Sequence, residues 1–211
     1  AISHETIYRH IWVDKEHGGT LHVHLRRANK PFRKRYGAYD SRGRLAGKRH
    51  ISTRSAGAEH RSRFGHWEGD TVLGASQAGA CVLTMVERKA RWTEIGKLAR
   101  RTTAEVNARA EQLIKRQPRR VRTMTLDNGT EFHGYKELEA HVDTRCYFAT
   151  PHHSWERGTN ENTNGLIRQY LPKGASMEDL TQDDCDRIAM KLNRRPRKSL
   201  GFRTPEECYV P

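Results

Sequence analysis

The chain has 211 residues, a length that suits one catalytic domain with an attached segment or two small domains. Its 39 Lys and Arg residues outnumber 25 Asp and Glu residues, and the net charge of +14 predicts attraction to a polyanion, with nucleic acid ranked before an anionic membrane surface. No apolar run approaches the roughly 20 residues that span a bilayer and no signal peptide opens the chain, so the sequence predicts a soluble protein without a membrane-spanning helix.

The first quarter of the chain is strongly basic. Residues 1–58 hold 13 Lys and Arg residues but only four acidic residues. They begin with a short predicted helix, 3–12, which Ser3 caps. The run 26–54 combines glycines with many cations and is densest at three consecutive residues, Arg33, Lys34 and Arg35. It is either a disordered solvated tail or an arm that follows phosphates and becomes ordered on DNA.

The composition changes near residue 60, where apolar residues become frequent. Three stretches read as strands, 66–73, 79–86 and 91–98, and the short turns between them predict an antiparallel meander. A capping-box pattern at Thr102 then opens a helix that extends to about Gln117.

Strands and helices alternate in the second half of the chain. The expected elements are strand 121–126, helix 135–142, strand 145–149, a helix that Ser154 caps after Pro151, and a last helix capped by Thr181. This order predicts an α/β fold for residues 59–211, with a mixed five-stranded sheet and helices packed on its faces.

The four cysteines are spaced too widely for a zinc knuckle. Cys81 lies in an apolar run and Cys185 on an apolar helix face, so both are expected in the core. Two disulfides are the alternative, but reduced thiols in a cytosolic protein are the interpretation we prefer.

Three acidic residues stand out by their positions. Asp70 lies in the first strand, where we place it on the side opposite Val72, and Asp127 ends the fourth strand. If these strands are neighbours, the two acids lie side by side, and the following helix can bring Glu161 onto them, with 33 residues between Asp127 and Glu161. Each acid also has a plain alternative, because Asp127-Asn-Gly forms ordinary turns, Asp70 suits a surface strand, and Glu156 competes for the third position.

Three converging carboxylates without cations repel each other, so such a cluster implies divalent metal. Hard oxygen ligands favour Mg²⁺ or Mn²⁺ over zinc. Two such ions support the in-line displacement of a phosphoryl group, and on a protein of this charge the natural substrate is the DNA backbone.

Four motifs carry a resemblance to a known family: Gly65–Thr71, Thr125–Phe132, Ser154–Gly165 and Asn193–Pro205. Together they resemble the DDE transposases of bacterial insertion sequences, and specifically the IS-thirty family, whose third acid follows the second after this same interval. The resemblance covers essentially the whole chain and is most specific around Glu161.

The resemblance implies a ribonuclease-H-like fold shared with retroviral integrases. It also implies cleavage at transposon ends to free a 3′-hydroxyl, which then attacks another phosphodiester. Asp70, Asp127 and Glu161 carry over as the catalytic metal ligands, so Glu156 is better interpreted as a helix-start residue. The family's partners are double-stranded DNA, both transposon ends and target, and further copies of the chain in a dimer or larger complex.

Several polar side chains near the acids are candidates for contacts with DNA. Arg157 and Arg168 share the helix face of Glu161, although Arg157 could instead pair with a carboxylate. Asn160 and Asn164, with Asn128, could hold waters near the metals or contact DNA. His152 and His153 are either loop filler or phosphate contacts, and Trp155 is expected to anchor the helix start rather than stack on bases.

The chain departs from the family at its start. Residues 3–9 resemble the closing helix of the family's DNA-binding region, but the preceding helices are absent, so we expect a truncated transposase. It would act in the bacterial cytoplasm, at the nucleoid. Two alternatives remain: a ribonuclease-H-like nuclease that cuts without joining, and a non-mobile DNA-binding derivative, against which the presence of all three acids argues.

Overall fold

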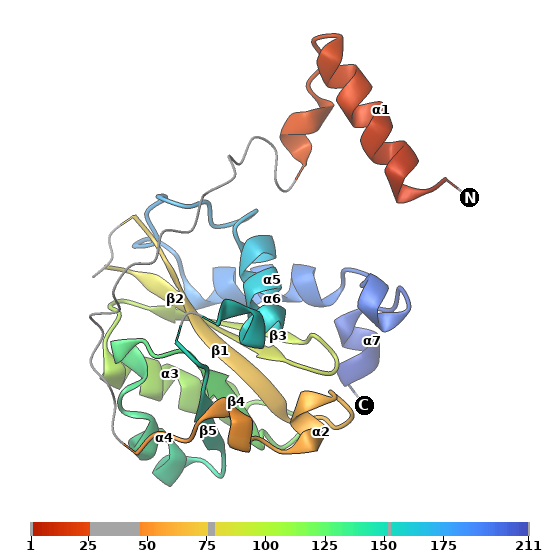
Figure 1. Ribbon diagram of the computed structural model, residues 1–211. Coiled ribbons are helices and arrows are strands. Elements are labelled where there is room, and N and C mark those ends of the chain that lie inside the picture. The colour runs from red at the N-terminus through yellow and green to blue at the C-terminus, as the bar shows by residue number, and fades with distance from the viewer. Residues whose placement is uncertain (1, 26–46, 76–78, 152, 211) are drawn as a thin grey trace. The chain divides into compact units, whose positions relative to one another are not determined.

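The computed structural model describes residues 2–25, 47–75, 79–151 and 153–210, and it divides the chain into two units, 1–39 and 40–211 (Figure 1). The first unit holds α1, His4–Glu16, followed by a 3₁₀ turn, Leu21–His24. Ser3 caps α1 as expected, because its hydroxyl accepts the backbone N–H of Thr6 at 3.2 Å. The predicted phosphate contacts Arg33, Lys34 and Arg35 lie outside the described residues.

A five-stranded sheet forms the centre of the second unit (Figure 1). Its strands are β1, His66–Leu73; β2, Cys81–Glu87; β3, Thr93–Leu98; β4, Thr123–Leu126; and β5, Arg145–Phe148. They lie in the order β3-β2-β1-β4-β5, antiparallel from β1 to β3 and parallel from β1 through β4 to β5. The predicted mixed sheet, with three antiparallel strands and two parallel ones, is therefore confirmed.

Helices cover both faces of the sheet. On one face, α3, Thr103–Lys115, and α4, Tyr135–His141, pack with odd-numbered residues of β1 such as Trp67. On the other, α5, Gly158–Ile167, and α6, Gln182–Asn193, pack with Val72. Since side chains alternate along a strand, these two clusters form separate cores on the two sides of one sheet.

The helix termini follow from local sequence. Thr102 accepts the backbone N–H of Glu105, and Thr181 forms a complete capping box with Asp184. A shorter helix that the sequence did not lead us to expect, α7, Pro205–Tyr209, begins with another capping box at Thr204. It buries the Tyr209 ring against Trp67 and Trp92.

The described end of the basic segment packs against the sheet. It forms a 3₁₀ turn, Ile51–Thr53, and α2, Ala56–Glu59. His50 makes a parallel bridge to Phe148 in β5, and the Arg54 guanidinium donates to Thr125 in β4 at 3.0 Å. The predicted boundary between residues 58 and 59 stays a prediction, and residues 47–58 share contacts with the core.

Two expectations need correction. Asp70 lies on the same face as Val72, not opposite it, because residues two apart in a strand point the same way. The helix expected from Ser154 starts later: Ser154–Arg157 forms a 3₁₀ turn and α5 begins at Gly158. The backbone of Arg157 explains the shift, since its φ of −117° and ψ of 35° are not helical.

Two further observations concern the cysteines and the lengths of the helices. All four cysteines are free thiols, and Cys81 and Cys185 are fully buried. Within the described residues, no helix is long and apolar enough to cross a membrane.

Candidate active site

Two parallel strands bring Asp70 and Asp127 to the same region of the sheet. In the ladder between β1 and β4, Glu68 lies opposite Thr125, so each acid sits two residues beyond a paired position. Asp70 is still within β1, whereas Asp127 directly follows β4. Both side chains are about one-fifth exposed. The condition that these two strands are neighbours is therefore met.

Arg157 lies between the two carboxylates. One guanidinium nitrogen is 3.4 Å from the nearer oxygen of Asp70, and the other is 3.5 Å from Asp127. The first nitrogen also donates to the carbonyl of Gly69 at 3.3 Å. Arg157 thus pairs with acids in this structure, which is the alternative that its sequence position left open.

The Asp70 carboxylate is held by further donors. The backbone N–H of Thr71 donates to one oxygen at 2.9 Å, and the amide of Asn164 donates to the other at 3.0 Å. Burial nevertheless raises the pKa of Asp70 to about 6, and the negative charges of Asp127 and Glu131 act in the same direction against Arg157. A cation at this position is therefore favourable.

Glu131 is a fourth acid in this region, which we did not predict. It lies in a 3₁₀ turn, Thr130–Phe132, and is almost fully buried. One carboxylate oxygen accepts the Arg101 Nε–H at 2.8 Å and the Thr71 hydroxyl at 2.8 Å. Its other oxygen is buried without a hydrogen-bond partner among the described residues. Its place four residues after Asp127 was the available signal, because a 3₁₀ turn brings the chain back on itself.

Glu161 does not join these acids in this conformation. It lies in the first turn of α5 and is exposed to solvent. Across the described ranges, no group of three His, Cys, Asp or Glu side chains is placed to hold one metal ion. Glu161 follows Arg157 by four residues, but Arg157 lies outside α5 with a non-helical backbone, so the shared helix face expected for the two residues is not formed.

Glu156, the competitor for the third position, has a local role. Its carboxylate accepts the backbone N–H of Thr150 at 2.7 Å and pairs with the hydroxyl of the same residue at 2.9 Å. His153 lies 3.5 Å from it. These contacts suit the interpretation of Glu156 as a helix-start residue. His152 lies outside the described residues, and the side chain of Trp155 is not described.

The other predicted DNA contacts differ in accessibility. Asn160 is fully buried and meets the Thr84 hydroxyl at 3.3 Å, so it offers no surface to DNA in this conformation. Asn164 is half-buried and faces Asp70. Arg168 is half-buried and donates to the carbonyl of Leu171 at 3.3 Å.

A buried ion pair ties α5 to the sheet. Glu68, fully buried in β1, pairs with Arg88 and also accepts the backbone N–H of Asn160 at 2.8 Å. One charge thus compensates a buried guanidinium and an unsatisfied N–H at the start of the helix. Although Glu68 lies in the motif Gly65–Thr71, nothing in its spacing marked it as buried.

Both the fold and part of the sequence are similar to integrase cores. Residues 60–154 match the family described as "Integrase core domain". The structure resembles the catalytic core domain of BIV integrase, with a TM-score of 0.52 over 69% of this chain and 93% of that chain, at 20% identity. The ribonuclease-H-like fold expected from the motifs is confirmed.

The sequence is also related to transposases of insertion sequences. It is 43% identical over 208 residues to the transposase for insertion sequence element IS4351 of Bacteroides fragilis, covering 99% of this chain and 64% of that protein. It is 35% identical over 213 residues to the transposase InsI for insertion sequence element IS30A of Escherichia coli (strain K12), covering 98% of this chain and 55% of that protein. The resemblance to transposases of this kind is therefore confirmed, while the chain spans between 55% and 64% of the length of these two relatives.

Proposed function

We propose that this chain is the catalytic portion of a DDE transposase, which cleaves DNA at the ends of an insertion sequence and joins the freed 3′-hydroxyl to target DNA. The observation that carries the proposal is the pair Asp70 and Asp127, two carboxylates on adjacent parallel strands that meet around one cationic group. The relatives named as transposases support it.

The donor set suits a hard divalent cation. Asp70 and Asp127 supply carboxylate oxygens, and the guanidinium of Arg157 already shows that positive charge is stabilised between them. We propose that these acids and Glu161 hold Mg²⁺ or Mn²⁺, two ions in all. Bound there, the metal would activate the attacking oxygen and stabilise the leaving oxygen of a phosphoryl transfer.

The protein's own residues have separate tasks in this proposal. Asp70 is oriented by the Thr71 N–H and the Asn164 amide, so its carboxylate keeps a fixed direction. Arg157 leaves the acid pair and becomes available to a DNA phosphate, as Arg168 does further along α5. Glu161, which is exposed in the first turn of α5, then turns toward the two acids.

We extend the proposal to the parts that surround the core. Residues 1–58 serve as a basic DNA-binding segment, and 59–211 serve as the catalytic core. Substrates are transposon ends and target duplex, which two or more copies of the chain hold together. The protein would act on the bacterial nucleoid in the cytoplasm.

One experiment separates this function from that of a nuclease with the same fold. A labelled duplex that carries a pre-cut transposon end with a free 3′-hydroxyl is incubated with the protein, Mn²⁺ and a target plasmid. Joined product is the expected result. Shortened strands without joined product would instead establish a hydrolytic nuclease, and binding without either product would indicate a non-mobile DNA-binding derivative.

A further inference from the structure

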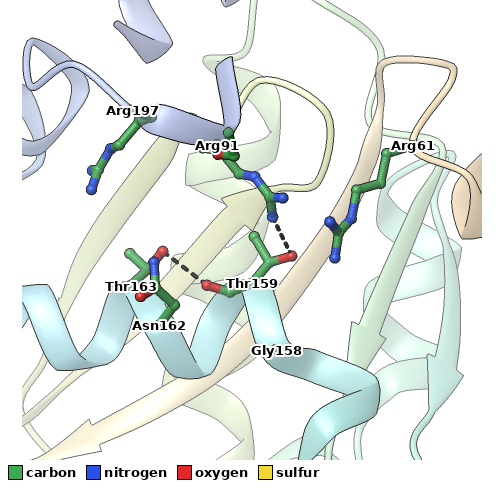
Figure 2. A pocket seen from close by; sticks show the side chains of 8 residues that line it. Arg61, Arg91, Gly158, Thr159, Asn162, Thr163 and Arg197 are labelled. Atoms are coloured by element: carbon green, nitrogen blue, oxygen red, sulfur yellow. Dashed lines mark hydrogen bonds between the residues drawn. The ribbon is translucent and has the colours of Figure 1, made fainter. Parts of the chain in front are cut away.

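A cavity of about 380 Å³ lies beside α5, at its amino-terminal half (Figure 2). Three arginines from distant parts of the sequence line it, together with hydroxyl and amide side chains and no acidic residue. The lining residues on which we rely are Arg61, Arg91, Arg197, Thr159, Asn162 and Ser199. This volume falls within the range of pockets that hold a small ligand.

The cavity gathers positive charge from three segments. Arg61 follows α2, Arg91 lies in the turn between β2 and β3, and Arg197 follows α6. Figure 2 shows the Arg91 guanidinium directed at α5, where it donates to the Thr159 hydroxyl at 2.6 Å. Since a neutral hydroxyl compensates no charge, this contact orients the cation and leaves its charge in place.

The electrostatics of Arg91 agree with a site that attracts an anion. Burial lowers the pKa of Arg91 to about 10, and the positive charge of Arg61 lowers it further, more strongly than Glu68 raises it. A guanidinium in such surroundings is stabilised by an anion that enters the cavity, and a phosphate oxygen matches its fork of donors.

The cavity and the acids lie on different sides of the same helix. At 100° per residue, Gly158, Thr159, Asn162 and Thr163 share one side of α5, and these four line the cavity. Asn160 and Asn164 lie on another side, from which Asn164 reaches Asp70. An anion in the cavity would therefore leave the acid pair free for a different phosphate.

We propose that the cavity formed by Arg61, Arg91 and Arg197 binds a backbone phosphate of the DNA, away from the phosphate that reacts. The inference rests on the proposed function, because it takes DNA as the substrate. As a consequence, the bound DNA strand holds one side of α5, the helix that carries Glu161, while the other side of α5 faces Asp70. The cavity thus positions the helix and the strand relative to each other.

The test measures binding of a fluorescent duplex by anisotropy, without metal, across a series of salt concentrations. Arg61→Gln and Arg91→Gln each remove one positive charge from the cavity. Arg187→Gln is the matched control, because Arg187 is exposed on α6 and already pairs with Asp184. Loss of one phosphate contact should lower the slope of log K against log salt by about 0.9 and raise Kd about threefold to tenfold.

We expect both cavity variants to show this change, Arg187→Gln to bind more tightly than either, and Arg91→Lys to recover most of the affinity. Thermal unfolding of each variant shows that it is folded. If wild-type protein binds the duplex and the two cavity variants bind it equally well, the inference is wrong and the transposase proposal stands. If wild-type protein does not bind the duplex, the proposed function itself fails.

A free anion is the other source of the same chemistry. Inorganic phosphate is therefore added during thermal unfolding of the wild type and of Arg91→Gln. If it stabilises only the wild type while both proteins bind DNA with equal affinity, the cavity takes free phosphate, and the assignment to DNA is overturned.

Discussion

The guanidinium of Arg157 lies 3.4 Å from the carboxylate of Asp70 and donates to the carbonyl of the preceding residue, Gly69. A positive side chain thus stands where the proposed function places metal. Two carboxylates brought together in a partly buried site need such a counter-charge, and the protein supplies one from the segment that precedes α5.

A substitution of Arg157 tests its role as the counter-charge of Asp70 and Asp127. Without its guanidinium, the charges of Asp70 and Asp127 are uncompensated, so Arg157→Gln should lower the free energy of unfolding by about 1–3 kcal/mol in metal-free buffer. Mn²⁺ should then stabilise the variant more than the wild type, because no side chain competes for the acids. Thermal unfolding with and without Mn²⁺ measures both effects, with Arg168→Gln, at the opposite end of α5, as the control. A smaller Mn²⁺ effect in Arg157→Gln than in wild type would contradict the model of competition.

The three proposed ligands can be tested singly. Asp70→Asn, Asp127→Asn and Glu161→Gln should each reduce cleavage and joining by at least about 100-fold, because each removes a charge that the metal requires. DNA binding, measured by anisotropy, should largely survive. Glu156→Gln is the control and should retain joining, since Glu156 contacts Thr150 rather than the acid pair. Normal strand transfer by Glu161→Gln would remove Glu161 from the site.

Glu131 should affect the acid pair through its neighbours. Glu131→Gln leaves the Arg101 guanidinium without its charged partner, so the free energy of unfolding should fall by about 1–3 kcal/mol. The half-saturating Mn²⁺ concentration in thermal unfolding should also rise, because one nearby negative charge is lost. Glu137→Gln, on the exposed side of α4, is the matched control and should change neither value. Equal behaviour of the two variants would show that Glu131 has no influence on the site.

The buried pair of Glu68 and Arg88 predicts a larger cost. Removing one member of a buried pair leaves an uncompensated charge, so Glu68→Gln should lower the free energy of unfolding by about 3–5 kcal/mol. Hydrogen exchange should be faster at the backbone N–H of Asn160, which donates a hydrogen bond to the Glu68 carboxylate in the folded protein. Protection of that amide at the wild-type level would mean that α5 is held by other contacts.

His66 predicts the pH dependence of stability. Burial, followed by the positive charge of Arg122, lowers its pKa to about 4 from an ordinary value of 6.5. Between these two pKa values His66 is neutral in the folded protein but protonated in the unfolded chain. The contribution of His66 to stability is therefore complete above pH 6.5 and is lost as the pH falls toward 4. Between pH 7.5 and 4.5 in urea unfolding, the wild type should lose about 2–3 kcal/mol relative to His66→Gln. The raised pKa of Asp70 acts in the opposite direction in both proteins and cancels in this comparison. His60→Gln, at an exposed position, should keep the wild-type slope, and an unchanged slope in His66→Gln would assign the dependence to other groups.

Local patterns in the sequence account for most of the fold. The alternation of residues 66–73 reproduces β1 with its exact bounds, and the hydroxyls of Thr102 and Thr181 mark the starts of α3 and α6. These features depend on neighbours within a few residues, so periodicity and capping chemistry are sufficient to predict them. That the first and fourth strands are neighbours was a condition in the sequence argument, and the fold meets it.

The tertiary structure was needed to identify the partners of the charged side chains. Whether Arg157 would face solvent, DNA or an acid depended on where the segment after Pro151 settles against β1, and local sequence carries no information on that contact. Glu131 and Glu68 likewise receive their roles from partners 30 and 20 residues away, Arg101 and Arg88. The sequence by itself selected Asp70, Asp127 and Glu161 as the expected ligands, through motif and strand order, and this selection stays a prediction. Only the folded chain decided which cations and amides surround those acids, because burial and long-range contact are set by packing.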